Sequence, residues 1–157
     1  MHSEYLSHLF LKNDLAEGRY EIDGEPVALE DIDIPIFCVG TVRDHVAPWK
    51  SVYKIHLLTD SDVTFVLTSG GHNAGIVSEP GHKGRTYQIA TALHAARYVP
   101  PGQWQHNTPL KEGSWWEAWQ KWLGSHSEGK HQPPAMGNHA LGYSVLANAP
   151  GTYVLVK

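Results

Sequence analysis

Two short apolar segments stand out along the chain, and each predicts a buried β-strand. They cover residues 34–40 and 63–67 and are almost continuously apolar. Continuous apolar runs of this length are typical of strands whose two faces are both covered, as in a parallel sheet. Between them, Pro48 and Trp49 predict the start of a helix that runs to about Leu58, because proline is tolerated in the first helical turn. The pattern therefore predicts a βαβ unit with parallel strands.

The N-terminal residues predict a helix and then a polar connection. Ser3 can cap a helix over residues 3–17, and Gly18 can end it. The following residues, 19–33, are polar, and a short hairpin is expected at Asp23-Gly24. The apolar face of the predicted helix consists of Tyr5, Leu6, Leu9, Phe10 and Leu15.

The residues after the second strand predict mainly helices. One helix is predicted near residues 86–98, and Pro100-Pro101-Gly102 ends it. Ser114 and Glu117 have the spacing of a capping box, so a second helix is predicted to start there and to end at Gly124. Four of the six tryptophans lie at this helix. Three of them share one helical face, namely Trp115, Trp119 and Trp122.

These elements fit a single domain of 157 residues. Residues 1–33 form the helix and connection, residues 34–75 the βαβ unit, and residues 76–157 a helical C-terminal extension. The extension is expected to end in a hairpin between Tyr143–Ala147 and Tyr153–Val156. Two parallel strands need neighbours at both edges, which this unit does not provide. We therefore expect the C-terminal piece of a larger α/β catalytic domain; a small α+β domain closed by weaker strands is the alternative.

Composition and charge exclude several classes of function. The net charge of −4, without a Lys/Arg run, gives no reason to expect a nucleic-acid partner. No apolar run approaches the ~20 residues that span a bilayer, and the N-terminus lacks the pattern of a signal peptide. The single cysteine excludes an internal disulfide. We expect a soluble, cytoplasmic chain without a membrane span.

An acid and a base follow the two predicted strands. Asp44 comes shortly after the first strand and His72 shortly after the second, and functional groups collect at these carboxyl ends of a parallel sheet. A carboxylate that binds one imidazole nitrogen leaves the other nitrogen free as a general base. A capping carboxylate and a turn histidine are the structural alternatives. Three neighbours are expected at the pair. His45 could compete as the base, but neighbours on an extended stretch point in opposite directions, so a structural role is expected for it. Trp49 is expected as a packing residue and Gly71 in a tight turn.

The sequence offers neither a nucleophile nor a metal site beside this pair. In the α/β-hydrolase order the nucleophile precedes the acid and the histidine, and it occupies a sharp turn flanked by glycines. Cys38 is the only thiol and lies inside the first predicted strand, where cysteine behaves as a small hydrophobe. No serine stands in G-x-S-x-G, and the eleven histidines form no metal-binding motif. We expect no metal and no cofactor.

Several motifs together resemble the C-terminal part of the polyhydroxyalkanoate synthases, which belong to the α/β-hydrolase superfamily. The Asp-His-x-x-Pro-Trp motif at Asp44–Trp49 and the Gly-Gly-His motif at Gly70–His72 are specific in combination. The resemblance covers nearly the whole chain. Its further motifs are Tyr5–Leu15, Asp31–Pro35, Phe65–Gly75, Gly113–Trp116 and Ala149–Val154.

The resemblance implies an acyltransferase that polymerises (R)-3-hydroxyacyl-CoA into polyester and releases CoA. It implies that His72 is the general base for a catalytic cysteine, and that Asp44 orients His72 and helps to activate the incoming hydroxyl. The family's G-x-C-x-G box is absent, so we expect this chain to be inactive alone and to need the N-terminal part of a synthase. Other expected partners are the CoA thioester, the polyester product with its granule surface, and a second copy of the chain.

Two other functions stay open at this point. An esterase or depolymerase of the same fold would also need an upstream nucleophile, a serine in place of cysteine. A non-catalytic module would dock on granules or on a synthase through the apolar face at Trp115–Trp122. The motifs of the C-terminal tail favour the synthase over the esterase.

Overall fold

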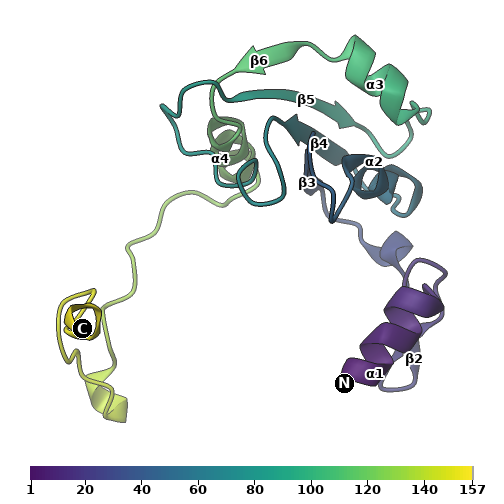
Figure 1. Ribbon diagram of the computed structural model, residues 1–157. Coiled ribbons are helices and arrows are strands. Elements are labelled where there is room, and N and C mark those ends of the chain that lie inside the picture. The colour runs from purple at the N-terminus through teal and green to yellow at the C-terminus, as the bar shows by residue number, and fades with distance from the viewer. Residues whose placement is uncertain (157) are drawn as a thin grey trace. The chain divides into compact units, whose positions relative to one another are not determined.

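A four-stranded mixed sheet lies at the centre of the first of two compact units (Figure 1). The computed structural model describes residues 1–156; the first unit is Met1–Ser125, and the second begins at His126. The strands, hydrogen-bonded in this order, are β3 (Ile36–Thr41), β4 (Val63–Thr68), β5 (Thr86–Ala92) and β6 (Leu110–Glu112).

The predicted βαβ unit is confirmed. β3 and β4 are parallel and pair over their full lengths, so that Thr41 and Thr68 end them side by side. α2 (Trp49–Val52) connects the two strands and continues as a 3₁₀-helix over Tyr53–Leu57. The connection therefore tightens after one helical turn, but it ends close to the expected Leu58.

The sheet is not purely parallel, because one predicted helix is a strand. The prediction of a helix near residues 86–98 is wrong: Thr86–Ala92 forms β5, which pairs antiparallel with the whole of β4. β-Branched and aromatic residues favour such a pleated surface, and the pairing buries Tyr87 and Gln88. β6 then adds a second antiparallel strand that the sequence pattern does not predict. The mixed sheet with its helices is consistent with an α/β fold.

The run of prolines after β5 begins a helix rather than ending one. α3 (Pro101–Asn107) has a proline in its first turn, where the missing N–H has no partner to lose. The helix is tied to β5, since the Gln88 side-chain amide donates to the carbonyl of Gln105 at 2.7 Å. Trp104 on the same helix is buried.

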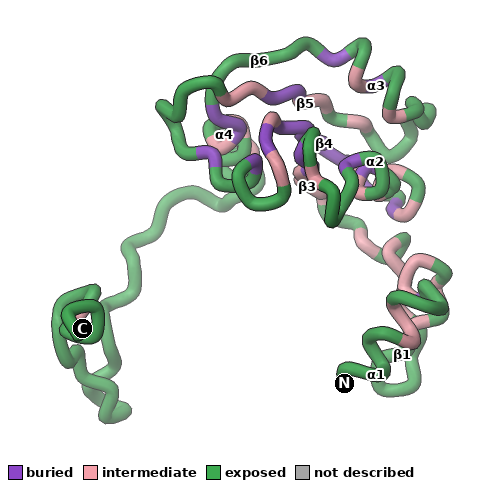
Figure 2. Tube along the Cα trace, viewed as in Figure 1, coloured by how far each residue is buried: buried purple, intermediate pink, exposed green. Residues whose placement is uncertain are grey.

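The core has two parts, one on each face of β4. On one face, Phe65 and Leu67 pack against the aromatic residues of α2 and α3; the cluster is Trp49, Tyr53, Phe65, Leu67 and Trp104. On the other face, Val66 packs with Tyr87 and Trp115, beside the start of α4 (Trp116–Ser125). β4 is thus covered on both faces, and Figure 2 colours this strand as buried. Truncating a buried aromatic such as Phe65 to alanine typically costs about 3–5 kcal/mol.

The N-terminal helix is shorter than predicted and changes its type. α1 (His2–Glu4) continues as a π-helical segment over Tyr5–Leu11. It ends well before Gly18, because Asn13 takes a left-handed conformation with φ of 54° and the next residue, Asp14, is buried. Much of the predicted apolar face remains exposed, including Tyr5, Leu6 and Phe10.

The predicted hairpin at Asp23-Gly24 is confirmed. β1 (Tyr20–Ile22) pairs antiparallel with β2 (Glu25–Val27). Asp23 and Gly24 have φ values of 53° and 85°, which suit the type I′ turn that two-residue hairpins prefer. A short 3₁₀-helix at Leu29–Asp31 follows the hairpin.

α4 forms where the capping pattern predicts it. The Ser114 hydroxyl accepts the backbone N–H of Trp116 at 3.0 Å, which satisfies one of the unpaired donors at the start of the helix. The helix ends at Ser125, one residue beyond Gly124. Trp119, on its outer surface, is 40% exposed.

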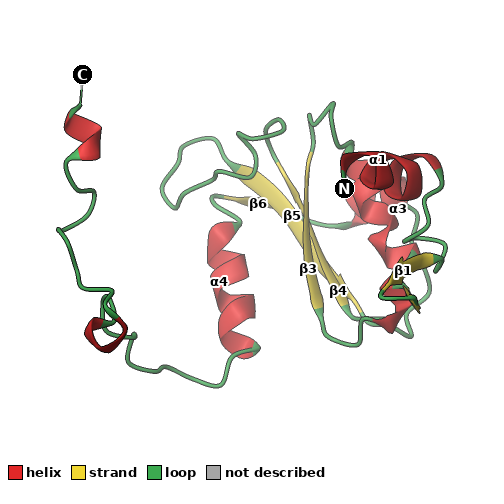
Figure 3. Cartoon of the chain, turned by 90° about the horizontal axis from the view of Figure 1, so that it is seen from below, coloured by secondary structure: helices red, strands yellow, loops and turns green. Residues whose placement is uncertain are grey.

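The second unit contains short helices instead of the predicted C-terminal hairpin. Tyr153–Leu155 and His139–Leu141 are 3₁₀-helices, and the described residues of this unit form no strand beyond an isolated bridge between Asn138 and Tyr143 (Figure 3). Most of these residues are exposed. A lone two-stranded hairpin without a covered face is marginal in water, which is why the expected pairing does not form.

Candidate active site

Asp44 and His72 lie at the carboxyl ends of the two parallel strands, in the turns that follow β3 and β4. Backbone hydrogen bonds extend the pairing past the strands, from Val42 N–H to Thr68 at 3.0 Å and from Arg43 N–H to Gly70 at 2.9 Å. The two side chains meet: Nδ1 of His72 lies 2.9 Å from Oδ2 and 3.1 Å from Oδ1 of Asp44. The sheet therefore joins residues that stand 28 positions apart in the chain.

The Asp44 carboxylate is held from its backbone side as well. Its Oδ1 accepts the N–H groups of Val46 at 2.9 Å and Ala47 at 2.8 Å. The bond from Ala47, followed by the contact with His72, lowers the pKa of Asp44 below its ordinary value of 3.8. The carboxylate thus stays ionised near neutral pH and can only accept hydrogen bonds.

This charge state fixes the tautomer of a neutral His72. Because Asp44 only accepts, Nδ1 of His72 carries the proton and Nε2 keeps a lone pair. Within residues 1–156, Nε2 has no hydrogen-bond partner, and the side chain is 47% exposed. The arrangement is that of an oriented general base whose reactive nitrogen is open to a second group.

Two glycines, Gly70 and Gly75, shape the turn that carries His72. A Cβ on Gly70, where φ is +115°, would lie 2.8 Å from Cα of Gly75. A Cβ on Gly75 would lie 2.6 Å from Cγ2 of Thr41, at the end of β3. By contrast, a Cβ on Gly71 would meet only the carbonyl of Arg43 at 3.8 Å, an ordinary contact. Close packing therefore requires glycine at positions 70 and 75 more than at position 71.

The two other expected neighbours of the pair have different surroundings. Trp49 is buried and belongs to the core, and a Cβ on Gly40 would approach its Cβ to 3.0 Å. Trp49 thus packs where α2 meets β3. His45 is exposed next to Asp44, and the contact with the carboxylate is made by His72.

Cys38 lies in the middle of β3 and faces the core. It packs against the cluster of Trp49, Tyr53 and Phe65. Burial raises the pKa of its thiol to about 11. A nucleophilic cysteine needs the opposite, a thiolate that is stable near neutral pH.

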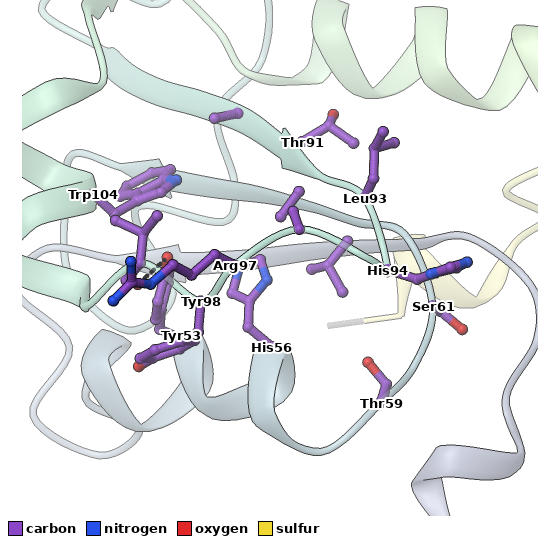
Figure 4. Close-up of a pocket in the computed structure, with 15 residues that line it drawn as sticks. Tyr53, His56, Thr59, Ser61, Thr91, Leu93, His94, Arg97, Tyr98 and Trp104 are labelled. Atoms are coloured by element: carbon purple, nitrogen blue, oxygen red, sulfur yellow. Dashed lines mark hydrogen bonds between the residues drawn. The ribbon is translucent and has the colours of Figure 1, made fainter.

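Neither Asp44 nor His72 is among the residues that line a cavity of about 290 Å³; Figure 4 draws its lining residues. Its walls come from the 3₁₀-helix after α2, the end of β5 and α3, with Tyr53, His56, Arg97 and Trp104 among the lining residues. Val63 also lines it, and this residue begins β4, whereas His72 follows the end of that strand. The cavity and the acid–base pair therefore belong to opposite ends of the strands.

Residues 1–156 contain neither a metal-binding cluster nor a helix that could cross a membrane. No group of three or more His, Cys, Asp or Glu side chains in residues 1–156 is placed to hold a metal ion. Over the same residues, no helix has both the length and the apolar character needed to cross a membrane.

No family model matches the chain, but its sequence is similar to several curated proteins. The chain is 34% identical over 154 residues to the poly(3-hydroxyalkanoate) polymerase subunit PhaC of Cupriavidus necator. The aligned region covers 98% of this chain and 25% of that protein. The chain is also 34% identical over 161 residues to the subunit of the same name from Rhizobium etli, covering 99% of this chain and 24% of that protein. The poly(3-hydroxyalkanoate) polymerase of Methylorubrum extorquens is 35% identical over 156 residues, with coverage of 99% and 25%.

The chain thus spans about a quarter of the length of the curated relatives it matches. The similarity extends over nearly all of its own residues. The resemblance drawn from the sequence motifs is confirmed by these relatives. Identity of 32–35% along almost the entire chain identifies it as a segment of the polyhydroxyalkanoate synthase family.

Proposed function

We propose that this chain supplies the acid and the base of a cysteine-dependent acyltransferase that polymerises (R)-3-hydroxyacyl-CoA into polyester and releases CoA. The observation that carries the proposal is the 2.9 Å contact between Asp44 and His72 at the ends of two parallel strands. The names of the relatives, poly(3-hydroxyalkanoate) polymerases, support the product class. They also favour the synthase over an esterase or depolymerase of the same fold.

In the proposed loading step, Nε2 of His72 takes the proton of a cysteine thiol that belongs to another part of the synthase. The thiolate attacks the thioester carbonyl of the substrate, and the bond from that carbon to the sulfur of CoA breaks. The leaving CoA thiolate takes the proton from His72. Asp44 stabilises the protonated imidazole throughout, since its lowered pKa keeps it ionised.

The proposed elongation step uses the same base in the same order. Nε2 of His72 takes the proton of a 3-hydroxyl group, and the oxygen attacks the acyl group on the cysteine. An ester bond forms, the carbon–sulfur bond breaks, and the cysteine recovers the proton from His72. We assign hydroxyl activation to His72 rather than Asp44, because a carboxylate of lowered pKa that already accepts three hydrogen bonds is a weak base.

The open edge of the sheet supports the proposal that further chain completes the fold. β3 is the first strand in the order β3-β4-β5-β6, so within the described residues only β4 pairs with it. Parallel strands normally have neighbours on both sides, and an unpaired apolar edge invites pairing with another strand. A strand from the rest of the synthase is the proposed occupant of this edge. In its absence, self-association and contact with polyester granules are the proposed alternatives.

The chain alone should therefore not turn over substrate. Cys38 is a poor nucleophile because of its raised pKa, and the proposal assigns the nucleophile and the oxyanion-stabilising groups to other segments. The test is CoA release from 3-hydroxybutyryl-CoA, measured with the isolated chain at high concentration. Turnover by this chain that is lost in His72→Ala would show that the site is complete, and the proposal of a supplied half-site would be wrong.

A second experiment tests the assigned roles in an active enzyme. A hybrid polymerase carries this chain in place of the matching segment of the Cupriavidus necator protein, and its CoA release is compared with that of the parent. We expect turnover in the hybrid, its loss in His72→Ala, and a strong decrease in Asp44→Asn. His45→Ala separates the competing base: if it abolishes turnover while His72→Ala does not, the assignment of the base is wrong.

A further inference from the structure

We infer that Trp115 and Trp116 are positioning residues that hold the His72 turn through their indole N–H groups. This inference rests on the proposed function of His72 as the base and adds the question of what keeps its turn in place. Trp115 Nε1 donates to the carbonyl of Gly75 at 3.1 Å, and Trp116 Nε1 donates to the carbonyl of Ile76 at 2.9 Å. These carbonyls stand three and four residues after His72.

A third contact comes from the residue before the two tryptophans. The Ser114 hydroxyl donates to the carbonyl of Ser78 and also accepts the N–H of Trp116. Three consecutive residues at the start of α4 thus bind carbonyls of the segment between Gly75 and Ser78. The acceptors lie about 40 positions earlier in the chain, so the contacts are formed by tertiary folding alone.

Trp115 is itself fixed by the core. It is 5% exposed, and its ring stacks on Phe37 of β3 with centroids 6.2 Å apart and planes inclined by 26°. It also packs with Val66 and Tyr87 from β4 and β5. The anchor of the His72 turn is therefore a side chain whose position three strands determine.

The opposite side of the turn rests on the end of β3. Gly75 packs against Thr41, and Arg43 donates its backbone N–H to the carbonyl of Gly70 at 2.9 Å. The turn is thus held between β3, which leads to Asp44, and the start of α4. This arrangement matters because glycine-rich segments lose much conformational entropy on ordering, and a misplacement of about 1 Å can strongly reduce catalysis.

Removing an indole N–H should therefore loosen the turn without altering the groups that react. The change that isolates this atom is site-specific replacement of Trp116 by 3-benzothienylalanine, which keeps the bicyclic shape and lacks the N–H. Trp116→Phe is the genetically encoded counterpart. Trp116 is the better target because Trp115 also fills the core. Trp119→Phe on the same helix is the matched control, since within residues 1–156 the Trp119 indole N–H has no hydrogen bond.

The first readout is the amide exchange of the turn in the full chain. Three amides report on it, since Gly75 donates to Gly71, and Ile76 and Val77 both donate to Asn73. We expect their exchange to accelerate about fivefold in either Trp116 variant, the factor that corresponds to a net hydrogen bond of about 1 kcal/mol. Exchange in β4 should be unchanged, and Trp119→Phe should leave both regions unchanged. Unchanged exchange of the turn in both Trp116 variants would overturn the inference.

The second readout is the state of the His72 ring, which a merely structural role of Trp116 would not move. In the parent chain we expect Nδ1 of His72 to resonate as a protonated nitrogen and Nε2 as an unprotonated one, assigned through the spectrum of His72→Ala. In the Trp116 variants the two ¹⁵N shifts should move toward each other as the contact with Asp44 is made less often. Shifts identical to those of the parent, with a loosened turn, would mean that the anchor does not position His72.

Activity of the hybrid polymerase then separates the two proposals. If positioning is the role of Trp116, Trp116→Phe should lower kcat several-fold and leave KM unchanged, because Trp116 acts through His72. Full activity of His72→Ala would defeat the proposed function, while the exchange and ring measurements would still decide whether the turn is anchored. Loss of activity in His72→Ala, together with an unchanged kcat in both Trp116 variants, would instead defeat the positioning inference alone.

Discussion

Within residues 1–156, two Asp–His pairs make nearly identical contacts. Nδ1 of His8 lies 2.8 Å from Oδ2 of Asp14, and Nδ1 of His72 lies 2.9 Å from Oδ2 of Asp44. Both carboxylate side chains are 8% exposed, and the imidazoles are 42% and 47% exposed. The contact geometry alone therefore cannot tell a catalytic pair from a structural one.

The surroundings of the two pairs differ. Asp14 also binds the guanidinium of Arg19, whose second nitrogen donates to the carbonyl of Lys12 at 3.0 Å. This first pair joins residues six positions apart and locks the end of the N-terminal helix. Asp44 instead binds two backbone N–H groups, and the sheet brings its histidine from 28 positions away. The partners of the second carboxylate oxygen and the route through the fold therefore distinguish the proposed catalytic pair from the local one.

The largest expected effect separates the two histidines. In the hybrid polymerase, His72→Ala should lower kcat on the order of 10⁴–10⁶-fold, since removal of one member of a catalytic unit costs nearly as much as removal of all. His8→Ala should leave kcat within about twofold, because the His8 ring contacts Asp14 and Tyr20 of its own N-terminal region. CoA release from 3-hydroxybutyryl-CoA measures both. A comparable loss in the two variants would mean that the contrast between the pairs is wrong.

The two aspartates should differ in the same direction by a smaller factor. Asp44→Asn should lower kcat by about 10²–10⁴-fold, because an amide no longer fixes the tautomer of His72 or stabilises its charged form. Asp14→Asn should leave kcat unchanged and lower the midpoint of urea unfolding, since Arg19 and His8 lose their acceptor charge. Activity and unfolding of both variants are measured in parallel. An Asp14→Asn hybrid with reduced kcat and unaltered unfolding would contradict the structural role of the first pair.

Of the two pairs, the sequence predicts Asp44–His72 and not His8–Asp14. β3 and β4 are recognisable because strands buried on both faces need continuous apolar runs, and Asp44 and His72 follow these runs directly. The pair of His8 and Asp14 escapes prediction, since its residues look like ordinary positions of a helix that continues to Gly18. The helix stops earlier because Asn13 adopts positive φ, a tertiary choice that the apolar spacing does not reveal.

The remaining errors have a common physical cause. β5 contains Thr86, Ile89 and Ala90 in an order that suits a helix or a strand, and pairing with β4 decides between them. The contacts of Trp115 and Trp116 with the His72 turn join segments about 40 positions apart, so the local spacing of residues cannot predict them. Local patterns thus predict elements with a clear apolar pattern, such as β3 and β4. Partners that are distant in the sequence determine the other elements and contacts.

Acid should weaken both pairs in the same pH range. The bond from Ala47 and the contact with His72 lower the pKa of Asp44 below 3.8. For Asp14, burial raises the pKa, but the hydrogen bonds from His8 and Arg19 outweigh it and the net shift is downward. Each carboxylate therefore contributes stability that is fully present above 3.8 and is lost as the pH falls through the lowered folded-state pKa.

Urea unfolding at a series of acidic pH values tests this linkage. Asp14→Asn and Asp44→Asn should each flatten the loss of stability below about pH 4, relative to the parent chain. Glu30→Gln, on the exposed short helix after β2, serves as the control and should leave the slope unchanged. An acid limb as steep in both Asn variants as in the parent would show that neither pKa is lowered by folding.

The smallest expected effect on kcat concerns Cys38. If the nucleophile comes from another part of the synthase, the Cys38 thiol should be unreactive. Its pKa of about 11, against an ordinary value of 9.0, leaves roughly 100-fold less thiolate at pH 8. Iodoacetamide should therefore alkylate the folded chain on the order of 100-fold more slowly than the chain in urea, and Cys38→Ala should leave kcat of the hybrid unchanged. Rapid alkylation of the folded chain would place a reactive thiol within this segment. The Asp44–His72 pair would then have a nucleophile of its own, and the distinction between a complete and a supplied site would have to be redrawn.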